Sequence, residues 1–422
     1  MLFIYRVLPI GGIETFFVRM AKERHKNNLN TTLLLLSKPN ESNQELLKEM
    51  QKYSMVLFYY DIVYDIPILS KYFPLITPIK KEKIINLFKK VDQIHAFVGM
   101  HALLGQKLSL VAKKTVPITI GFYHYITYTW GDGNVAYHEK LNRQFVFDYL
   151  PKECLLFWSE GNKEYHATHK GMDFSKSKTF RLGVVDKKNI QISGRVHSIL
   201  KIVAVGRLVE FKTYNLYMLD IVRRLLDQGI PIQFDIYGDG PLHAQMQKKI
   251  EELNLHKNVF LKGSLDYSLF DETIAQYDLF IGSGTAIIQA ASLGVPSIVG
   301  VENMLNPKTY GYFSNVHQYE YNLKNLDLKL FNVEEIILDY FRFTDNQRLK
   351  LKNEHLNCTE MFTNQSCQDS MDKLKNINMP SDSFKVNYWL YEISRAFDQV
   401  LRVLNKNHPY NLRFKKLQKT DG

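Results

Sequence analysis

Short, uninterrupted apolar runs alternate along this chain with stretches whose apolar residues recur at helical spacing. Continuous apolar strands between helices predict a parallel sheet that is covered on both faces. This is the doubly wound α/β pattern. The runs are LFIYRVLP, TTLLLLS, QIHAFVG, VPITIGFYH and ECLLFWS, and then, after a polar stretch at 185–198, LKIVAVGRL, IQFDIYGDGP, NVFLKG, YDLFIGSG and VPSIVG.

The restart of the pattern predicts two domains, because 422 residues exceed what one hydrophobic core usually organises. We expect two Rossmann-like doubly wound domains that face each other across a cleft. The N-terminal domain would span residues 1–190 and the C-terminal domain 198–380. The apolar spacing of 383–406 predicts a helix, so 383–422 would be a C-terminal helix and basic tail that can pack back on the N-terminal domain.

The composition is that of a soluble globular protein, with 45% hydrophobic and 23% charged residues. The start, MLFIYRVLPIGG, lacks a basic leader and a cleavage site, which favours a first strand over a signal peptide. No run reaches the length of about 18 to 20 apolar residues that a membrane span needs. The three cysteines have no metal-ligand or paired spacing. These features predict a cytoplasmic protein with no disulfide framework and no zinc site.

The net charge of +11 could favour nucleic acid, anionic lipid or phosphorylated substrates. Lysines gather in PIKKEKIINLFKK (78–90) and in RFKKLQK (413–419). No nucleic-acid-binding signature accompanies them, so nucleic acid is not an expected partner. The alternatives are a solvated face and reversible binding to an anionic membrane surface through the first segment, with Ile84, Ile85, Leu87 and Phe88 adding apolar contact.

Two cations follow a core strand of the second domain. Arg207 stands directly after Val205-Gly206, and Lys212 is five residues further on. A guanidinium can bind phosphate with two hydrogen bonds, and an ammonium adds a point charge. A diphosphate leaving group needs such neutralisation. The pair therefore predicts a diphosphate-binding site, the alternative being surface cations on a loop.

A glycine-rich loop, Gly282-Ser283-Gly284-Thr285, opens a later helix. Such a loop at a helix N-terminus is a ready anion site, with amides and hydroxyls for phosphate oxygens. Gln289 follows about one helical turn after Thr285 and can face the same side. The alternative is an ordinary N-cap at the start of a buried helix.

Two further glycine turns admit both a structural and a functional interpretation. Gly11-Gly12, followed by Glu14, joins the first strand to the first helix and could hold a phosphate or an acceptor. It is not the GxGxxG pattern of dinucleotide sites. Gly238-Asp239, within Gly-Asp-Gly-Pro, forms a tight turn whose carboxylate could contact a ligand.

Together these loops resemble the group-1, or family 4, retaining glycosyltransferases, most like members that build bacterial surface polysaccharides such as capsule, O-antigen or exopolysaccharide. The resemblance is clearest over about 200–300 and fades beyond about 315. It also covers the GGIE start and Phe180–Val184, which looks like the family's interdomain segment. The motifs that carry it are VGRLVEFK, YGDGP, VFLKG and DLFIGSGTAIIQAASLGVPSI, in the family's order.

The resemblance implies a GT-B fold, with a nucleotide-diphosphate sugar bound in the C-terminal domain and a glycan or lipid-linked acceptor in the N-terminal one. Arg207 and Lys212 match the family's diphosphate pair, and Gly284 and Thr285 its phosphate loop. Ser283 and Gln289 would face the ribose and sugar. The implied reaction transfers a hexosyl-type sugar with retention and needs neither a metal nor a cofactor.

His124 in IGFYH matches the histidine that the family places near the transferred sugar; the alternative is a core histidine. Gln289 stands where the family has a glutamate, and the first glutamate of the family's pair has no counterpart because the loop is shorter. These departures keep open a second hypothesis, a glycosyltransferase-like subunit that binds or supports a partner enzyme without turnover. A nucleotide-sugar epimerase on the same fold is a further alternative.

Overall fold

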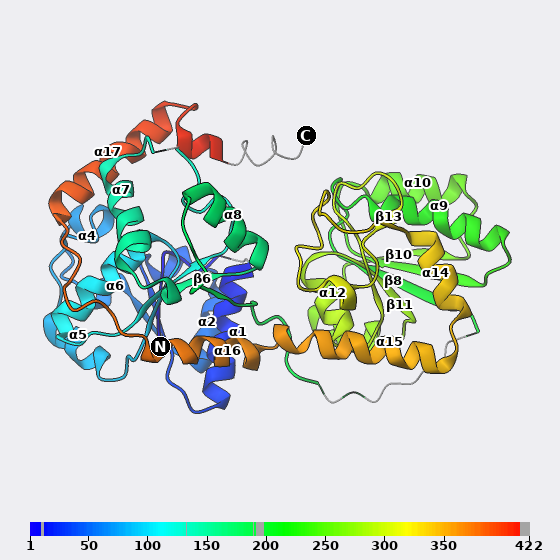
Figure 1. Ribbon diagram of the computed structural model, residues 1–422, viewed down its shortest axis with the longest axis horizontal. Coiled ribbons are helices and arrows are strands. Elements are labelled where there is room, and N and C mark those ends of the chain that lie inside the picture. The colour runs from blue at the N-terminus through cyan, green and yellow to red at the C-terminus, as the bar shows by residue number, and fades with distance from the viewer. Residues whose placement is uncertain (10–11, 132, 189, 191–197, 414–422) are drawn as a thin grey trace. The chain divides into compact units, whose positions relative to one another are not determined.

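The computed structural model describes residues 1–9, 12–131, 133–188, 190 and 198–413 (Figure 1). The chain divides into two compact units. Unit 1 comprises Met1–Gly183 and Asn364–Gly422, and unit 2 comprises Val184–Thr363. Each is described by itself below.

The chain returns to unit 1 earlier than the sequence pattern predicts, because residues 364–380 belong to unit 1 and not to the second domain. The reason is the contact between α1 (Gly12–Lys26) and α16 (Asn364–Asp372). The buried guanidinium of Arg24 forms an ion pair at 2.5 Å with Asp372, and Asn27 donates a hydrogen bond to Gln368. Since an unpaired buried charge is costly, α16 is fixed on α1.

In the described part of unit 1, seven parallel strands form one sheet in the order β3-β2-β1-β4-β5-β6-β7. Strand β1 pairs Leu2 with Thr32 of β2 on one side and with Ile94 of β4 on the other. The central strands are buried along their length, as the continuous apolar runs predict. The strands are β1 (Leu2–Tyr5), β2 (Thr32–Leu35), β3 (Met55–Phe58), β4 (Ile94–Ala96), β5 (Ile118–Phe122), β6 (Leu155–Phe157) and β7 (Lys178–Thr179).

Helices on the two faces of this sheet enclose two apolar cores, one around Leu104 and Phe122 and the other around Phe3 and Phe17. Besides α1 and α16, the helices are α2 (Gln44–Tyr53), α3 (Tyr59–Ile62), α4 (Leu69–Tyr72), α5 (Lys81–Phe88), α6 (Gly99–Ala112), α7 (Tyr137–Gln144), α8 (Glu160–Lys170) and α17 (Tyr388–Leu404). The last helix begins five residues later than predicted, where the Asn387 side chain accepts a hydrogen bond from the Leu390 amide. It lies against α7 (Figure 1).

The lysine-rich segment of unit 1 does not present the apolar face that membrane insertion would need. Ile84, Leu87 and Phe88 of α5 are buried and belong to the core beneath α6, and only Ile85 is exposed. The apolar spacing of this short helix therefore serves packing. The prediction that these side chains contact a membrane is wrong for the three buried ones.

In the described part of unit 2, five parallel strands form a sheet in the order β10-β9-β8-β11-β12. They are β8 (Leu200–Val205), β9 (Ile232–Tyr237), β10 (Val259–Gly263), β11 (Leu279–Gly282) and β12 (Ser297–Val299), with a small antiparallel pair of β13 (Lys308–Thr309) and β14 (Phe331–Asn332). The helices are α9 (Tyr214–Asp227), α10 (His243–Glu252), α11 (Phe270–Ile274), α12 (Gly284–Ala291), α13 (Phe313–Val316), α14 (Val333–Arg342) and α15 (Asp345–Cys358).

No helix among the described residues is both long and apolar enough to cross a bilayer.

Candidate functional site

The strand order of unit 2 places a crevice between β8 and β11. The chain continues from β8 to β9 on one side of the sheet, whereas β11 continues to β12 on the other. Ligands of doubly wound sheets bind at such a reversal, outside the carboxyl ends of the strands. Gly206 follows β8 and Ser283 follows β11, so the two predicted donor loops lie at this edge.

Lys212 folds back onto the turn that follows β8. A Cβ built on Gly206, whose φ is +148°, would lie 2.6 Å from the Lys212 ammonium nitrogen. Burial lowers the pKa of Lys212 below its usual value, nearby Arg207 lowers it further, and Glu302 opposes the shift. Arg207 itself is exposed. The two predicted cations therefore share one electrostatic environment, and glycine at 206 leaves room for the ammonium.

The Glu302 carboxylate, which no sequence motif predicts, lies near Ser283 and Lys212. The Ser283 hydroxyl donates a hydrogen bond of 2.8 Å to Glu302, in the loop after β12. Neighbouring contacts hold that loop: the Asn303 amide donates to the Phe211 carbonyl at 2.7 Å, and the Thr213 hydroxyl donates to the Met304 carbonyl at 2.7 Å. The only sequence signal for Glu302 is its position three residues after a buried strand.

The start of α12 is engaged by a neighbouring loop. The Gly284 amide donates a hydrogen bond of 3.0 Å to the Asn322 side chain, and the Tyr321 hydroxyl donates to the Gly284 carbonyl at 3.2 Å. Thr285 is exposed, and Gln289 is buried one turn further on. A phosphate at this terminus would therefore meet Thr285 first, and would displace Asn322 to reach the Gly284 amide.

The Gly238-Asp239 turn supports the turn at Gly206. A Cβ built on Gly238, at a φ of +152°, would lie 1.9 Å from the Gly206 carbonyl oxygen. The Gly206 amide donates to the Tyr237 carbonyl, and the Leu208 amide donates to the Asp239 carbonyl, both at 2.9 Å. The Asp239 carboxylate is exposed and accepts from the Gly240 amide at 2.7 Å. Glycine is thus required here for close approach of two backbones.

Unit 1 contains a cavity of about 920 Å³. It lies at the carboxyl edge of the sheet, where the strand order reverses between β1 and β4. Arg6 follows β1, Gly99 follows β4, and His124 follows β5; all three line the cavity. Desolvation lowers the pKa of the His124 imidazole below its usual value, although the side chain reaches solvent.

Glu14, the described side chain of the predicted Gly11-Gly12-Glu14 loop, does not line this cavity. Glu14 is buried and accepts a hydrogen bond of 2.8 Å from the Tyr5 hydroxyl, which joins α1 to β1. Gly12 is the first residue of α1, and Gly11 lies outside the described residues. Among the described residues, no group of three or more His, Cys, Asp or Glu side chains is placed to hold a metal ion.

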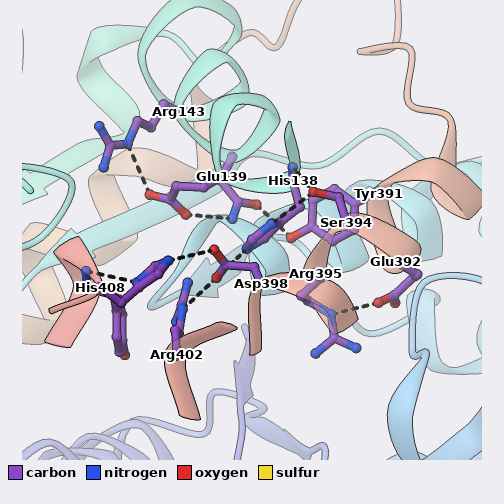
Figure 2. Close-up of polar contacts among 12 residues, drawn as sticks. His138, Glu139, Arg143, Tyr391, Glu392, Ser394, Arg395, Asp398, Arg402 and His408 are labelled. Atoms are coloured by element: carbon purple, nitrogen blue, oxygen red, sulfur yellow. Dashed lines mark hydrogen bonds and ion pairs between the residues drawn. The ribbon is translucent and has the colours of Figure 1, made fainter. Parts of the chain in front are cut away.

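A polar network joins α17 to α7 beside the cavity (Figure 2). Asp398 is buried and forms an ion pair with Arg402 at 2.5 Å, and its carboxylate also lies 3.3 Å from His408 Nε2 and 3.9 Å from His138 Nε2. Burial lowers the pKa of His138 to about 4. The network fixes the inner face of α17 in the cavity wall.

This chain is similar to known glycosyltransferases in sequence and in fold. The family model described as glycosyl transferases group 1 matches residues 185–308, which hold both predicted donor loops. The poly(ribitol-phosphate) alpha-N-acetylglucosaminyltransferase of Staphylococcus aureus (strain COL) is 27% identical over 126 residues, which are 27% of this chain and 24% of the relative. The match thus spans about a quarter of that relative's length.

Solved structures share the whole fold at low identity. Anabaena HepE in complex with UDP aligns with a TM-score of 0.55 at 14% identity, over 88% of this chain and 99% of that one. A glycosyltransferase from Rickettsia africae aligns with a TM-score of 0.56 at 14% identity, over 89% and 99%. A mutant of S. aureus TarM, in complex with fondaparinux, alpha-GlcNAc-glycerol and UDP, aligns with a TM-score of 0.51 at 12% identity, over 89% and 99%. Residues 185–308 thus resemble the group 1 glycosyltransferases, and the two Rossmann-like units have the GT-B fold.

Proposed function

We propose that this chain transfers a hexosyl-type sugar from a nucleotide-diphosphate sugar to a glycan or lipid-linked acceptor, in the synthesis of a bacterial surface polysaccharide. The observation that carries the proposal is the grouping of Arg207, Lys212, Ser283 and Glu302 at the β8/β11 reversal. Two cations and a helix N-terminus suit a diphosphate. The Glu302 carboxylate and the Ser283 hydroxyl can form hydrogen bonds with the hydroxyl groups of a sugar.

In this proposal Arg207, Lys212 and the amides at Gly284 and Thr285 hold the diphosphate, and Ser283 and Gln289 face the ribose and sugar. Their cationic and dipolar groups act on the charge that develops as the bond to the sugar breaks. The acceptor hydroxyl forms the new bond to the anomeric carbon, and its proton passes to the departing phosphate. Configuration is retained, and no metal is required.

The unit 1 cavity suits an acceptor that carries negative charge. Even with Arg395 and Arg402 paired to Glu392 and Asp398, cations outnumber carboxylates in its wall. Electrostatic complementarity of this kind selects and steers anionic ligands. The relative named above acts on poly(ribitol-phosphate), which is itself anionic. The charged side chains in the wall are Arg6, Lys38, Lys71, Arg395, Arg402 and Arg413, against Glu41 and Glu139.

The donor half of the proposal is tested by thermal unfolding with a panel of nucleotide sugars, since a ligand that binds only the folded state raises the midpoint. The donor that stabilises the protein should also release nucleoside diphosphate when an acceptor is added, with chelator present throughout. Stabilisation without transfer would favour the alternative, a glycosyltransferase-like binding or partner subunit. No stabilisation by any donor would reject both.

The acceptor half is tested by comparing phosphate-bearing and neutral glycans as acceptors. We expect the anionic acceptor to have the lower KM, and Lys38→Glu to raise that KM about tenfold or more with little change in kcat. Lys48→Glu, an exposed lysine on α2 outside the cavity wall, is the matched control. Equal KM values for the two acceptors would contradict an anionic substrate.

A further inference from the structure

The outer face of α17 is apolar over the whole length of the helix. Its exposed large apolar side chains recur three or four residues apart, so they share one side of the helix. The exposed fractions reach 64% for Trp389 and Phe397 and 81% for Val403. The full set is Trp389, Leu390, Ile393, Phe397, Val400, Leu401, Val403 and Leu404.

The charged side chains of α17 all lie on its inner face. Glu392 is buried and forms an ion pair with Arg395 at 2.7 Å, and Asp398 pairs with Arg402 (Figure 2). Tyr391 donates a hydrogen bond of 2.9 Å to Asn142 of α7. An ordinary surface helix has the opposite arrangement, with its apolar side toward the core. α17 is therefore held by polar contacts and shows its apolar side outward.

No described residue covers this face, and an apolar strip of this size usually marks an interaction surface. The sequence that follows the helix is basic. After α17, residues 405–422 contain Lys406, Arg413, Lys415, Lys416 and Lys419 but only one acidic side chain, Asp421. Lys406 is exposed at the end of the helix. An apolar face with Trp, Leu and Phe beside cations is the composition of helices that lie in the plane of a membrane interface.

We propose that α17 docks unit 1 on an anionic lipid surface, with its apolar face in the headgroup region and Lys406, exposed at the end of the helix, against the lipid charges. The positive charge favours a lipid surface over a second copy of the chain as the partner of this face. Anionic lipid complements the cations, each of which is attracted within a Debye length of the surface. A second copy of a chain with a net charge of +11 offers no such complement. α17 also has a row of exposed apolar side chains, whereas α5 exposes only Ile85.

This inference does not rest on the transferase proposal and is tested without it. The purified full chain is sedimented with vesicles of phosphatidylcholine alone and with vesicles that contain phosphatidylglycerol. We expect binding to the anionic vesicles at low salt that weakens at high salt. The double variant Ile393→Ser/Phe397→Ser should bind about tenfold less, because it removes two large exposed apolar side chains from the middle of the face. Both side chains are exposed, so the variant should fold.

Matched controls separate this helix from the lysine cluster and from self-association. Lys81→Glu/Lys83→Glu on α5 should bind the anionic vesicles nearly as the unaltered chain does. Emission from Trp389 should shift to the blue on vesicle binding, and Trp389→Phe should remove that shift while retaining binding. Wild-type protein left in the supernatant, or equal binding by the serine variant, would overturn the proposal. So would a concentration-dependent dimer that the serine variant abolishes while vesicle binding is unchanged.

Discussion

The Ser283 hydroxyl donates a hydrogen bond of 2.8 Å to the Glu302 carboxylate. This contact joins the loop after β11 to the loop after β12 and brings a negative charge close to Lys212, where it opposes the lowering of the Lys212 pKa. The ammonium and the carboxylate thus balance each other at the edge where the donor is proposed to bind. A diphosphate that pairs with Lys212 leaves the carboxylate available for hydroxyl groups.

Glu302→Gln should weaken donor binding by about 10- to 100-fold, because a hydrogen bond to a charged group contributes about 1.5–3 kcal/mol. Isothermal titration with the nucleotide sugar measures this change. Glu210→Gln is the matched control, since Glu210 is an exposed carboxylate on the loop between β8 and α9. The assignment of Glu302 to the donor site fails if both variants bind the donor like the unaltered chain.

Lys212→Ala should lower turnover by about one to three orders of magnitude, the usual cost of losing a preorganised electrostatic contact. Arg207→Ala should have a similar effect. The double variant should lose little more turnover than either single variant, because residues that act as a unit have non-additive effects. Lys257→Ala provides a control at an exposed cation elsewhere in unit 2. Steady-state release of nucleoside diphosphate is the measurement, and full activity in the double variant would end the diphosphate assignment.

The parallel sheets can be predicted from the sequence because each buried strand is a short, continuous apolar run between helices. Arg207 and Lys212 can be found because they follow such a run, and the structure places both beside Gly206. Glu302 escapes prediction because its loop has no glycine pattern, and its contact with Ser283 depends on the strand order. Strand order is a long-range property that local spacing does not encode.

The sequence also cannot distinguish what covers an apolar helix face. The spacing in α5 and in α17 indicates amphipathic helices in both cases, yet Leu87 faces the core and Phe397 faces solvent. The difference comes from polar partners elsewhere in the chain, such as Asn142 for α17. For the same reason the sequence pattern places the return to unit 1 too late, because the Arg24–Asp372 ion pair joins residues far apart in sequence.

Gly238→Ala should destabilise unit 2 and weaken donor binding together, because the added Cβ would lie 1.9 Å from the Gly206 carbonyl oxygen. We expect a loss of about 2 kcal/mol or more, from overpacking and from a strained backbone. Gly229→Ala is the matched control, since Gly229 also has a positive φ, +78°, but no atom within 4 Å of the new Cβ. Equal losses in the two variants by urea unfolding would show that the close approach at Gly206 contributes nothing.

Gln289→Glu should tighten donor binding by about 5- to 10-fold if the side chain faces the ribose, because a carboxylate accepts charge-assisted hydrogen bonds from two hydroxyls. It should also lower the free energy of unfolding without donor by about 1–3 kcal/mol, since Gln289 is buried. Calorimetry and thermal unfolding measure the two effects. Unchanged affinity in a folded variant would show that Gln289 is not a ribose ligand.

His355 should make the stability of unit 2 depend on pH. Its Nε2 accepts a hydrogen bond of 2.9 Å from the Ser297 amide, so its Nδ1 carries the proton and donates to the Leu351 carbonyl at 2.8 Å. Burial lowers the pKa of His355 from 6.5 to about 4. The unfolded chain therefore binds a proton below pH 6.5 that the folded chain does not bind until about pH 4.

The stability that this residue contributes is present above pH 6.5 and is lost as the pH falls toward 4. Across that window one such group changes the free energy of unfolding by about 1.36 kcal/mol per pH unit. His355→Gln should reduce the slope of the free energy of unfolding against pH by that amount. His256→Gln, at an exposed position, should leave this slope unchanged. Urea unfolding of both variants, from about pH 7.5 to about pH 4.5 in steps of about half a unit, makes the comparison. Equal slopes would mean that His355 is protonated in the folded protein, against the geometry at Ser297.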